Sequence, residues 1–177
     1  MFIGGCDLSI TSSGIILEEV DDRTLDIISV KYLGFTSKKK LEKDNILYYN
    51  NKDFNSDYAK YNWMKNKICE FLAPTTYVSV EDFAYGKAAA QGQIFSLAEF
   101  EGNIKLNLIE QGKKMRLYSV NSNKKFFTGY GLSDKISMYK AYQTWWENKP
   151  SLADLPVVDN GHGVRSYVRY RGCLRTL

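Results

Sequence analysis

Three runs rich in apolar residues open the chain, and their spacing predicts a group of strands. They cover residues 2–8, 13–20 and 25–35, and Ser, Thr, Gly and Asp residues lie between them. Short apolar runs bounded by turn formers are typical of strands joined by tight connections. The stretch that follows, residues 38–55, is rich in Lys and Asn. We expect it to be an exposed connection.

Helical and extended patterns alternate over the rest of the chain. A helix is predicted before Ala73-Pro74, a strand at 77–83, a second helix at 91–110 and a strand at 115–120, and a last helix follows a Ser133-Asp134 cap. The pattern predicts an α/β fold, a mixed β-sheet flanked by helices. The apolar positions of the three helices are Tyr61, Met64, Ile68, Phe71 and Leu72; Ile94, Leu97, Ala98, Ile104 and Leu108; and Ile136, Tyr139, Tyr142 and Trp146.

Acidic residues stand at the ends of two of these strands. Asp7 ends the first strand, and Glu81 and Asp82 end the strand that begins near Tyr77. A charge at the end of a buried strand costs several kcal/mol unless a cation or donor meets it. Asp7 therefore indicates a site residue, although such a residue can also cap its own turn. Neighbouring residues of a strand point to opposite faces, so only one of Glu81 and Asp82 can join Asp7, and the pattern leaves that choice open.

The order of three motifs resembles a known family. Gly5-x-Asp7-x-Ser9, with Gly14 five residues later, is followed by Val78-x-Val80-Glu81 and a long helix. A basic segment then runs from Lys124 through Gly129 and Gly131 to Lys135. Over residues 2–150 the chain resembles the RuvC-like Holliday junction resolvases of the ribonuclease H-like superfamily, particularly their bacteriophage branch.

The resemblance implies a ribonuclease H-like fold and a two-metal nuclease. In the family's pattern, Asp7 would bridge two Mg²⁺ ions, Glu81 would bind one of them, and Asp159 or His162 would bind the other. Lys125 or Lys135 would lie near the phosphate, and Mn²⁺ would be able to replace Mg²⁺. The implied activity is paired nicking of four-way DNA junctions by a homodimer, leaving 5′ phosphates. The residues expected to contact DNA are Ser9, Lys124, Lys125, Phe126, Phe127, Tyr130 and Lys135. The five from Lys124 to Tyr130 belong to what the sequence suggests is a glycine-flanked loop.

The C-terminal segment departs from the family. RuvC-like enzymes carry two metal ligands three residues apart here, and this chain has Asp159-Asn160-Gly161-His162. If His162 matches the family's His, Arg165 stands where a carboxylate is expected; if Asp159 matches the first ligand, His162 takes the last position. One acid is missing in either alignment. Lys plus Arg balance Asp plus Glu at 20 each over residues 1–159, while residues 160–177 contain four Arg and no acid. We therefore expect a nuclease domain over 1–158 and an atypical basic segment over 159–177, disordered or of foreign origin.

Composition narrows the class of protein. At 177 residues and 44% hydrophobic, the chain fits one domain with a substantial core. It shows no secretory signal and no apolar run long enough to span a membrane. Three cysteines without nearby Cys or His partners suggest neither a disulfide framework nor a zinc site. We expect a cytoplasmic protein, in the cytoplasm of the bacterial host if a phage encodes it.

Several features keep alternative interpretations open. Glu101 lies in the middle of an apolar helix face with Lys105 one turn later, which predicts either an i,i+4 pair or a helix used for dimerisation. Most of the 25 aromatic residues are expected in the core, Trp145 and Trp146 among them. Loss of the C-terminal ligands would leave a branched-DNA-binding protein without catalysis. A third possibility is an ATP-dependent phosphotransferase of the actin and sugar-kinase type, but the chain is short for its second phosphate loop.

Overall fold

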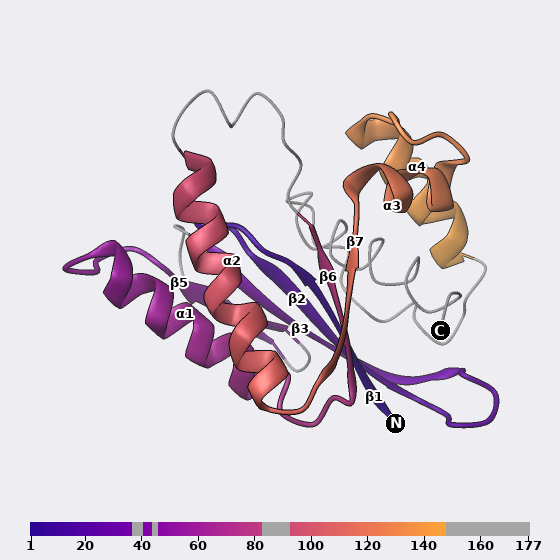
Figure 1. Ribbon diagram of the computed structural model, residues 1–177. Coiled ribbons are helices and arrows are strands. Elements are labelled where there is room, and N and C mark those ends of the chain that lie inside the picture. The colour runs from indigo at the N-terminus through magenta and orange to yellow at the C-terminus, as the bar shows by residue number, and fades with distance from the viewer. Residues whose placement is uncertain (37–40, 44–45, 83–92, 148–177) are drawn as a thin grey trace.

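In the computed structural model of the protein, a seven-stranded mixed sheet forms the centre. The structure describes residues 1–36, 41–43, 46–82 and 93–147. The strand order is β4-β5-β3-β2-β1-β6-β7 (Figure 1). The strands are β1 Phe2–Asp7, β2 Gly14–Val20, β3 Ile27–Thr36, β4 Leu41–Lys43, β5 Ile46–Asn50, β6 Tyr77–Glu81 and β7 Lys114–Tyr118; the helices are α1 Asp57–Phe71, α2 Gln93–Glu110, α3 Val120–Thr128 and α4 Lys135–Glu147.

Antiparallel and parallel pairings meet at β1. Strand β1 pairs antiparallel with β2 and parallel with β6, and β6 pairs parallel with β7. The carboxyl ends of β1, β6 and β7 therefore lie at one end of the sheet, the end near α3 in Figure 1. In an α/β sheet this is the end at which side chains from several strands can converge on a ligand.

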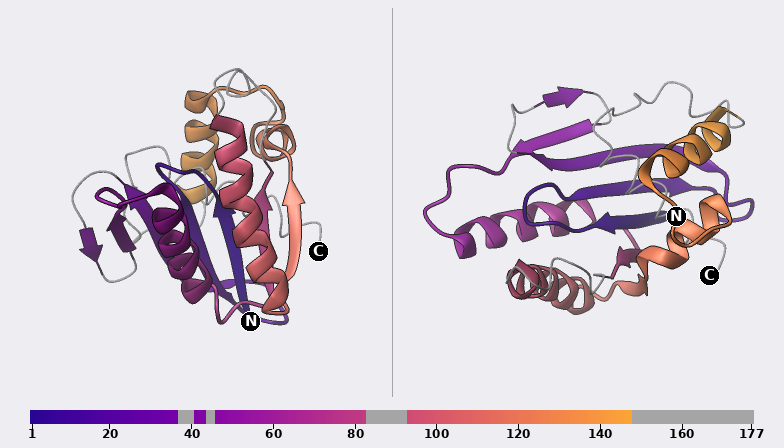
Figure 2. Two further views of the ribbon diagram at one scale, coloured as in Figure 1. Left: turned by 60° about the vertical axis from the view of Figure 1, so that its left-hand side comes forward. Right: turned by 90° about the horizontal axis from the view of Figure 1, so that it is seen from above.

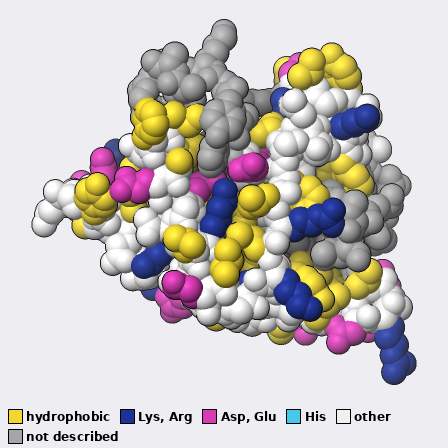
Figure 3. Space-filling model, in the orientation of Figure 1, with side chains coloured by type: hydrophobic (Ala, Val, Ile, Leu, Met, Phe, Trp, Pro, Cys, Tyr) yellow, Lys and Arg dark blue, Asp and Glu magenta, His cyan; other side chains and the backbone are white. Residues whose placement is uncertain are grey.

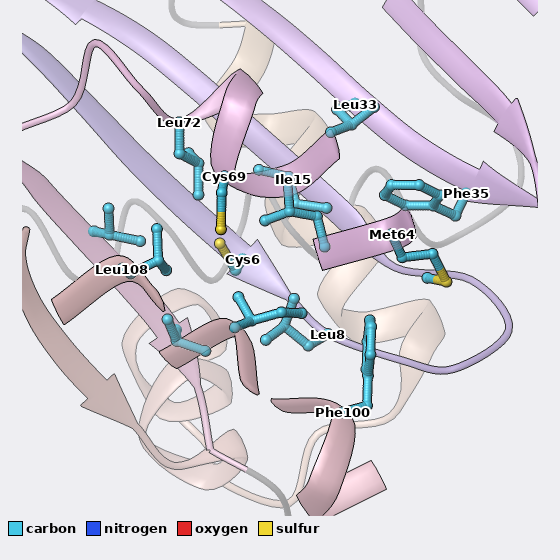
Figure 4. Packing of buried hydrophobic residues seen from close by; sticks show 14 of the residues in the cluster. Cys6, Leu8, Ile15, Leu33, Phe35, Met64, Cys69, Leu72, Phe100 and Leu108 are labelled. Atoms are coloured by element: carbon cyan, nitrogen blue, oxygen red, sulfur yellow. The ribbon is translucent and has the colours of Figure 1, made fainter. Parts of the chain in front are cut away.

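The main core lies between the sheet and the helices α1 and α2, which pack side by side on one face (Figure 2). Met64 and Ile68 of α1 and Phe100 of α2 are fully buried against Cys6 and Ile15 of the sheet (Figure 4). Gly4 allows this close packing, since an added Cβ would lie 2.6 Å from Leu72 Cδ2. The helices predicted before Ala73 and over 91–110 thus cover the same face.

The first three predicted strands are confirmed within two residues, but the expectation of an exposed connection over 38–55 is wrong. Within that stretch, β4 and β5 extend the sheet, and β5 pairs in parallel with β3. Ile46 and Tyr48 of β5 are buried beside Tyr32. This short strand was not predicted because Ile46-Leu47-Tyr48-Tyr49 is surrounded by Lys and Asn residues, which are typical of an exposed connection.

The basic segment is mostly helical, which corrects the predicted loop. The strand predicted over 115–120 ends at Tyr118, and Ser119 caps α3 by accepting a hydrogen bond from the Ser122 amide at 3.2 Å. Gly129 ends the helix in the left-handed region at a φ of 78°, where glycine is unstrained. The last helix begins as predicted, because Asp134 Oδ1 accepts a hydrogen bond from the Ser137 amide at 2.8 Å.

None of the helices in the described part of the chain has the length and apolar character needed to cross a membrane.

A candidate active site at the carboxyl ends of β1 and β6

Asp7 and Glu81 occupy equivalent positions on neighbouring parallel strands. The register pairs Cys6 with Val80, so Asp7 and Glu81 are the next residues along the same ladder. Cys6 and Val80 both point into the core beneath α1 and α2. Because side chains alternate along a strand, Asp7 and Glu81 point toward the opposite face. The register thus answers the question that the sequence pattern left open, since Glu81 and not Asp82 shares the face of Asp7.

Helix α3 reaches the Glu81 carboxylate. Asn123 Nδ2 donates a hydrogen bond to Glu81 Oε2 at 3.3 Å, and both residues are buried. Because the Ser119 cap starts the helix directly after β7, its fourth residue lies above the neighbouring strand β6. An amide that holds one carboxylate oxygen orients the other, which is the usual role of a residue behind a metal ligand.

Asp82 points the other way and meets α2. Lys105 Nζ lies 3.6 Å from Asp82 Oδ1 and 2.8 Å from Glu101 Oε2. Glu101 is almost fully buried, whereas the Asp82 side chain is 46% exposed. Burial raises the pKa of Glu101, the contact with Lys105 lowers it, and the charges of Asp82 and Asp7 raise it. The i,i+4 pair predicted from the sequence is confirmed, and it lies beside the end of β6, where Lys105 also meets Asp82.

Glycines form the sheet surface next to Asp7. The pairing aligns Asp7 with Gly14 on β2, and Gly14 with Gly34 on β3. The Tyr48 ring lies across Gly34, where an added Cβ would overlap Tyr48 Cε1. Burial raises the pKa of the neighbouring Tyr32 well above its ordinary value, and Tyr48 and the charge of Asp7 raise it further. A low-polarity wall therefore bounds the Asp7 carboxylate on the β3 side.

Ser9 belongs to the turn that follows Asp7. Ser13 Oγ donates to the Ser9 carbonyl at 2.6 Å and accepts from the Ser9 amide at 2.9 Å. Asn51, just after β5, donates from Nδ2 to the Thr11 carbonyl at 3.0 Å. The turn is thus fixed by Ser13 and Asn51, so that Ser9 is placed close to the end of β1.

The other predicted DNA-contacting residues lie on α3 and just beyond it. Lys125 and Phe126 are exposed, Lys124 and Phe127 are half-buried, and the two rings pack edge to face with centroids 5.1 Å apart. Tyr130, after the Gly129 cap, is 62% exposed. Lys135 is the first residue of α4, and its side chain lies outside the described part.

The predicted C-terminal ligands cannot be placed. Asp159, His162 and Arg165 lie outside the described residues, as does the boundary predicted at residue 158. Among the residues that the structure does describe, no group of three or more His, Cys, Asp and Glu side chains is arranged to hold a metal ion. Asp7 and Glu81 therefore provide part of a metal site, with oxygen ligands of the kind that Mg²⁺ prefers.

Sequence reasoning missed two features of this site. Asn123 had no distinguishing signal, because it is one of several polar residues in the segment 119–125. The Glu101–Lys105 pair was recognised from its i,i+4 spacing, but its contact with Asp82 depends on how α2 packs on the sheet.

Comparisons with known proteins support the fold. No protein-family profile and no curated protein sequence matches the chain. Among solved structures, it is similar to Thermus thermophilus RuvC, with 15% identity, a TM-score of 0.62 and coverage of 99% of this chain and 96% of that one. The T. thermophilus RuvC complex with a Holliday junction substrate gives 14% identity and a TM-score of 0.63 over 97% and 92% of the two chains. The chain has a ribonuclease H-like fold.

A viral structure is similar over the same length. The fowlpox virus Holliday junction resolvase shares 10% identity with a TM-score of 0.55, and the match covers 100% of both chains. The ribonuclease H-like fold implied by the sequence motifs is therefore confirmed. Identities this low bear on the fold alone, and not on the bacteriophage branch that the motifs suggested.

Proposed function

We propose that this protein is a metal-dependent, structure-specific endonuclease that resolves four-way DNA junctions by paired symmetric nicks. The observation that carries the proposal is the placement of Asp7 and Glu81 side by side at the carboxyl ends of β1 and β6 in a ribonuclease H-like fold. The neighbouring structures include an RuvC bound to a Holliday junction substrate. The bacteriophage affiliation rests on the order of the sequence motifs.

The described residues have distinct roles in this proposal. Asp7 and Glu81 would hold Mg²⁺, two ions per active site with Mn²⁺ able to substitute, and Asn123 would keep the Glu81 carboxylate in a binding orientation. When bound, the metal lowers the pKa of the attacking water and stabilises the leaving 3′ oxygen. The low-polarity wall formed by Tyr32 and Tyr48 would limit water on one side of Asp7. Electrostatic interactions of the Asp7 carboxylate would therefore be stronger there than in open solvent.

Substrate contacts would come from α3 and the turn after β1. Lys124 and Lys125 would neutralise backbone phosphates, together with Lys135 at the start of α4. Phe126, Phe127 and Tyr130 present aromatic surface on which unpaired bases of an opened junction can stack. Ser9 would donate to a phosphate oxygen.

A homodimer is part of the proposal, because a junction with near two-fold symmetry calls for two active sites related by a two-fold axis. Apolar side chains on α2 and β7 are unusually exposed, with Phe95, Leu106 and Ile109 more than half accessible and Leu117 at 47%. Figure 3 shows hydrophobic side chains gathered over this face with Lys and Arg between them. Strand β7 is also an edge of the sheet.

The dimer can be tested on this face. Replacing Leu106 by Glu should shift the protein from dimer to monomer in light scattering, since a charge in an apolar interface is unpaired. Ile28→Glu is the matched control, because Ile28 is equally exposed on β3, at 61% against 62% for Leu106. A wild-type protein that stays monomeric both alone and on junction DNA would rule out symmetric resolution by this chain.

The function itself is tested with purified protein, a labelled four-way junction and Mg²⁺. Paired nicks with 5′ phosphates that need a divalent ion support the nuclease. Linear duplex of the same sequence should be spared. A shift of the junction without cleavage under Mg²⁺ or Mn²⁺ would contradict the nuclease and support the second candidate below.

The second candidate is a branched-DNA-binding protein of the same fold that has lost catalysis. It is favoured by the C-terminal segment, which lacks one of the two acids of the family in either alignment of Asp159 and His162. Changing both Asp159 and His162 to Ala distinguishes the two. The nuclease should lose cleavage as fully as it does with Asp7→Asn, whereas in a binding protein the double change should leave both the lack of cleavage and the junction affinity as they are in the wild type.

A further inference from the structure

Lys105 places a cation at the end of the sheet that carries the acidic residues Asp7, Glu81 and Asp82. Its ammonium lies between Glu101 and Asp82, at 2.8 and 3.6 Å, and its side chain is only 15% exposed. Most surface lysines extend into water and keep their head group solvated. The Lys105 side chain instead packs against the protein, at the end of the sheet that also carries Asp7.

Stability does not explain the pair. Glu101 is buried in the middle of the apolar face of α2, between the fully buried Phe100 and Ile104. Replacing a buried ion pair by apolar residues of similar volume is often neutral or stabilising, because both charges lose their hydration. A Leu–Met pair at this position would therefore be expected to stabilise the fold at least as well as the Glu–Lys pair. The Glu–Lys pair is best explained by a use for the charge of Lys105.

The two contacts of Lys105 differ in strength. Glu101 is close and buried, which fixes the ammonium in place, whereas Asp82 is farther away and 46% exposed. A phosphate oxygen arriving from solvent can replace the longer contact while the shorter one is kept. The exchange leaves the ammonium with two anionic partners, Glu101 and the phosphate, in place of Glu101 and Asp82 in the free protein.

We propose that Lys105 is a further catalytic residue, which Glu101 anchors and which exchanges Asp82 for a backbone phosphate of the DNA strand bound at Asp7. This inference rests on the proposed nuclease function. Asp7 is near enough for its charge to act on Glu101, while Asn123 of α3 contacts Glu81 on the opposite face of the sheet. The cleaved strand would then pass between Lys105 on one side and α3 on the other.

The experiment must separate a phosphate contact from a structural ion pair. Lys105→Met alone leaves Glu101 buried without its cation, so it is expected to destabilise the fold. The double variant Glu101→Leu/Lys105→Met removes both charges and should fold at least as well as the wild type. Lys67→Met/Glu70→Gln on α1 is the control, since it also removes an ion pair, an exposed one with Nζ and Oε2 3.0 Å apart.

Junction affinity is measured against salt in the Asp7→Asn background, which prevents cleavage. The double variant should reduce the slope of log affinity against log salt by about one, the value for one lost phosphate contact, and the control should not change it. With Asp7 restored, the cleavage rate on saturating junction should fall about tenfold or more in the double variant only.

Each outcome has a clear meaning. A stable double variant with the wild-type slope and the wild-type cleavage rate would show that Lys105 is purely structural, although the nuclease proposal would stand. A wild-type protein that binds no branched DNA would overturn both proposals. Retention of the slope by Lys105→Arg, which keeps the charge, would further support the phosphate contact.

Discussion

Glu81 and Asp82 are adjacent in the chain, yet they point to opposite faces of the sheet and have different partners. Glu81 accepts a hydrogen bond from Asn123 of α3, while Asp82 lies beside Lys105 of α2. The parallel pairing with β1 gives Glu81 the same face as Asp7. The two neighbouring acids thus have different roles. Glu81 lies beside Asp7 as a candidate metal ligand, and Asp82 contacts the Lys105 ammonium.

This difference can be tested with two charge-neutralising variants. Glu81→Gln should lower junction cleavage by about 100-fold or more, because loss of a residue behind a metal ligand already costs roughly 10–100-fold. Junction binding should survive, since the phosphate-contacting surface is unchanged. Asp82→Asn should keep most of the cleavage activity. Equal losses in the two variants, measured as single-turnover rates, would contradict the assignment of Glu81.

Asn123 provides a second prediction. Asn123→Ala should weaken Mn²⁺ binding and cleavage by roughly 10–100-fold, because the Glu81 carboxylate loses the amide that orients it. Metal binding to the protein without DNA, measured by calorimetry, is the direct readout. Asn121→Ala on the same helix is the control, since Asn121 is exposed. Identical metal affinity in all three proteins would remove Asn123 from the site.

The parts of the fold with strong local patterns could be predicted from the sequence. The first three strands, α1, α2 and the Asp134 cap of α4 were all indicated by apolar periodicity or by turn and cap residues. Strand β5 and helix α3 could not be predicted in this way. Their formation depends on pairing with β3 and on the Ser119 cap, inside segments whose composition is mostly polar.

The candidate site shows the same limit. The acids Asp7 and Glu81 could be identified because a carboxylate at the end of an apolar strand is unusual. The role of Asn123 and the contact between Lys105 and Asp82 depend on which helix packs over which strand end. Such long-range placement leaves no periodic trace in the sequence.

Packing around Gly34 gives a prediction about stability. An added Cβ would overlap the Tyr48 ring, so Gly34→Ala should lower the free energy of unfolding by about 1–3 kcal/mol, as overpacking of a core does. Gly102→Ala is the matched control, because a Cβ at this position on α2 meets nothing within 4 Å. It should stabilise the protein by about 0.5–1 kcal/mol. Urea unfolding measures both, and equal effects of the two changes would show that Tyr48 does not restrict Gly34.

The last prediction concerns pH and Glu101. Burial raises the pKa of this carboxyl in the folded protein, so the native state binds more protons than the unfolded state between the two pKa values. The contribution of Glu101 to stability is therefore fully present below the unfolded pKa, about 4.3, and is lost as pH rises through the folded value. Glu101→Gln removes this dependence, while Lys105, Asp82 and Asp7 still face the position.

Urea unfolding of the wild type and of Glu101→Gln from pH 4 to pH 8, without divalent ions, measures this effect. The free energy of unfolding of the variant minus that of the wild type should rise with pH above about 4.3 and become constant above the folded pKa. Glu99→Gln, an exposed change on the same helix, should give a difference that hardly varies with pH. A constant difference for Glu101→Gln as well would mean that the Lys105 ammonium fully offsets the burial of the carboxylate. In that case Glu101 would balance the whole charge of Lys105 in the free protein. A contact between Lys105 and a phosphate would then have to weaken the Glu101–Lys105 ion pair.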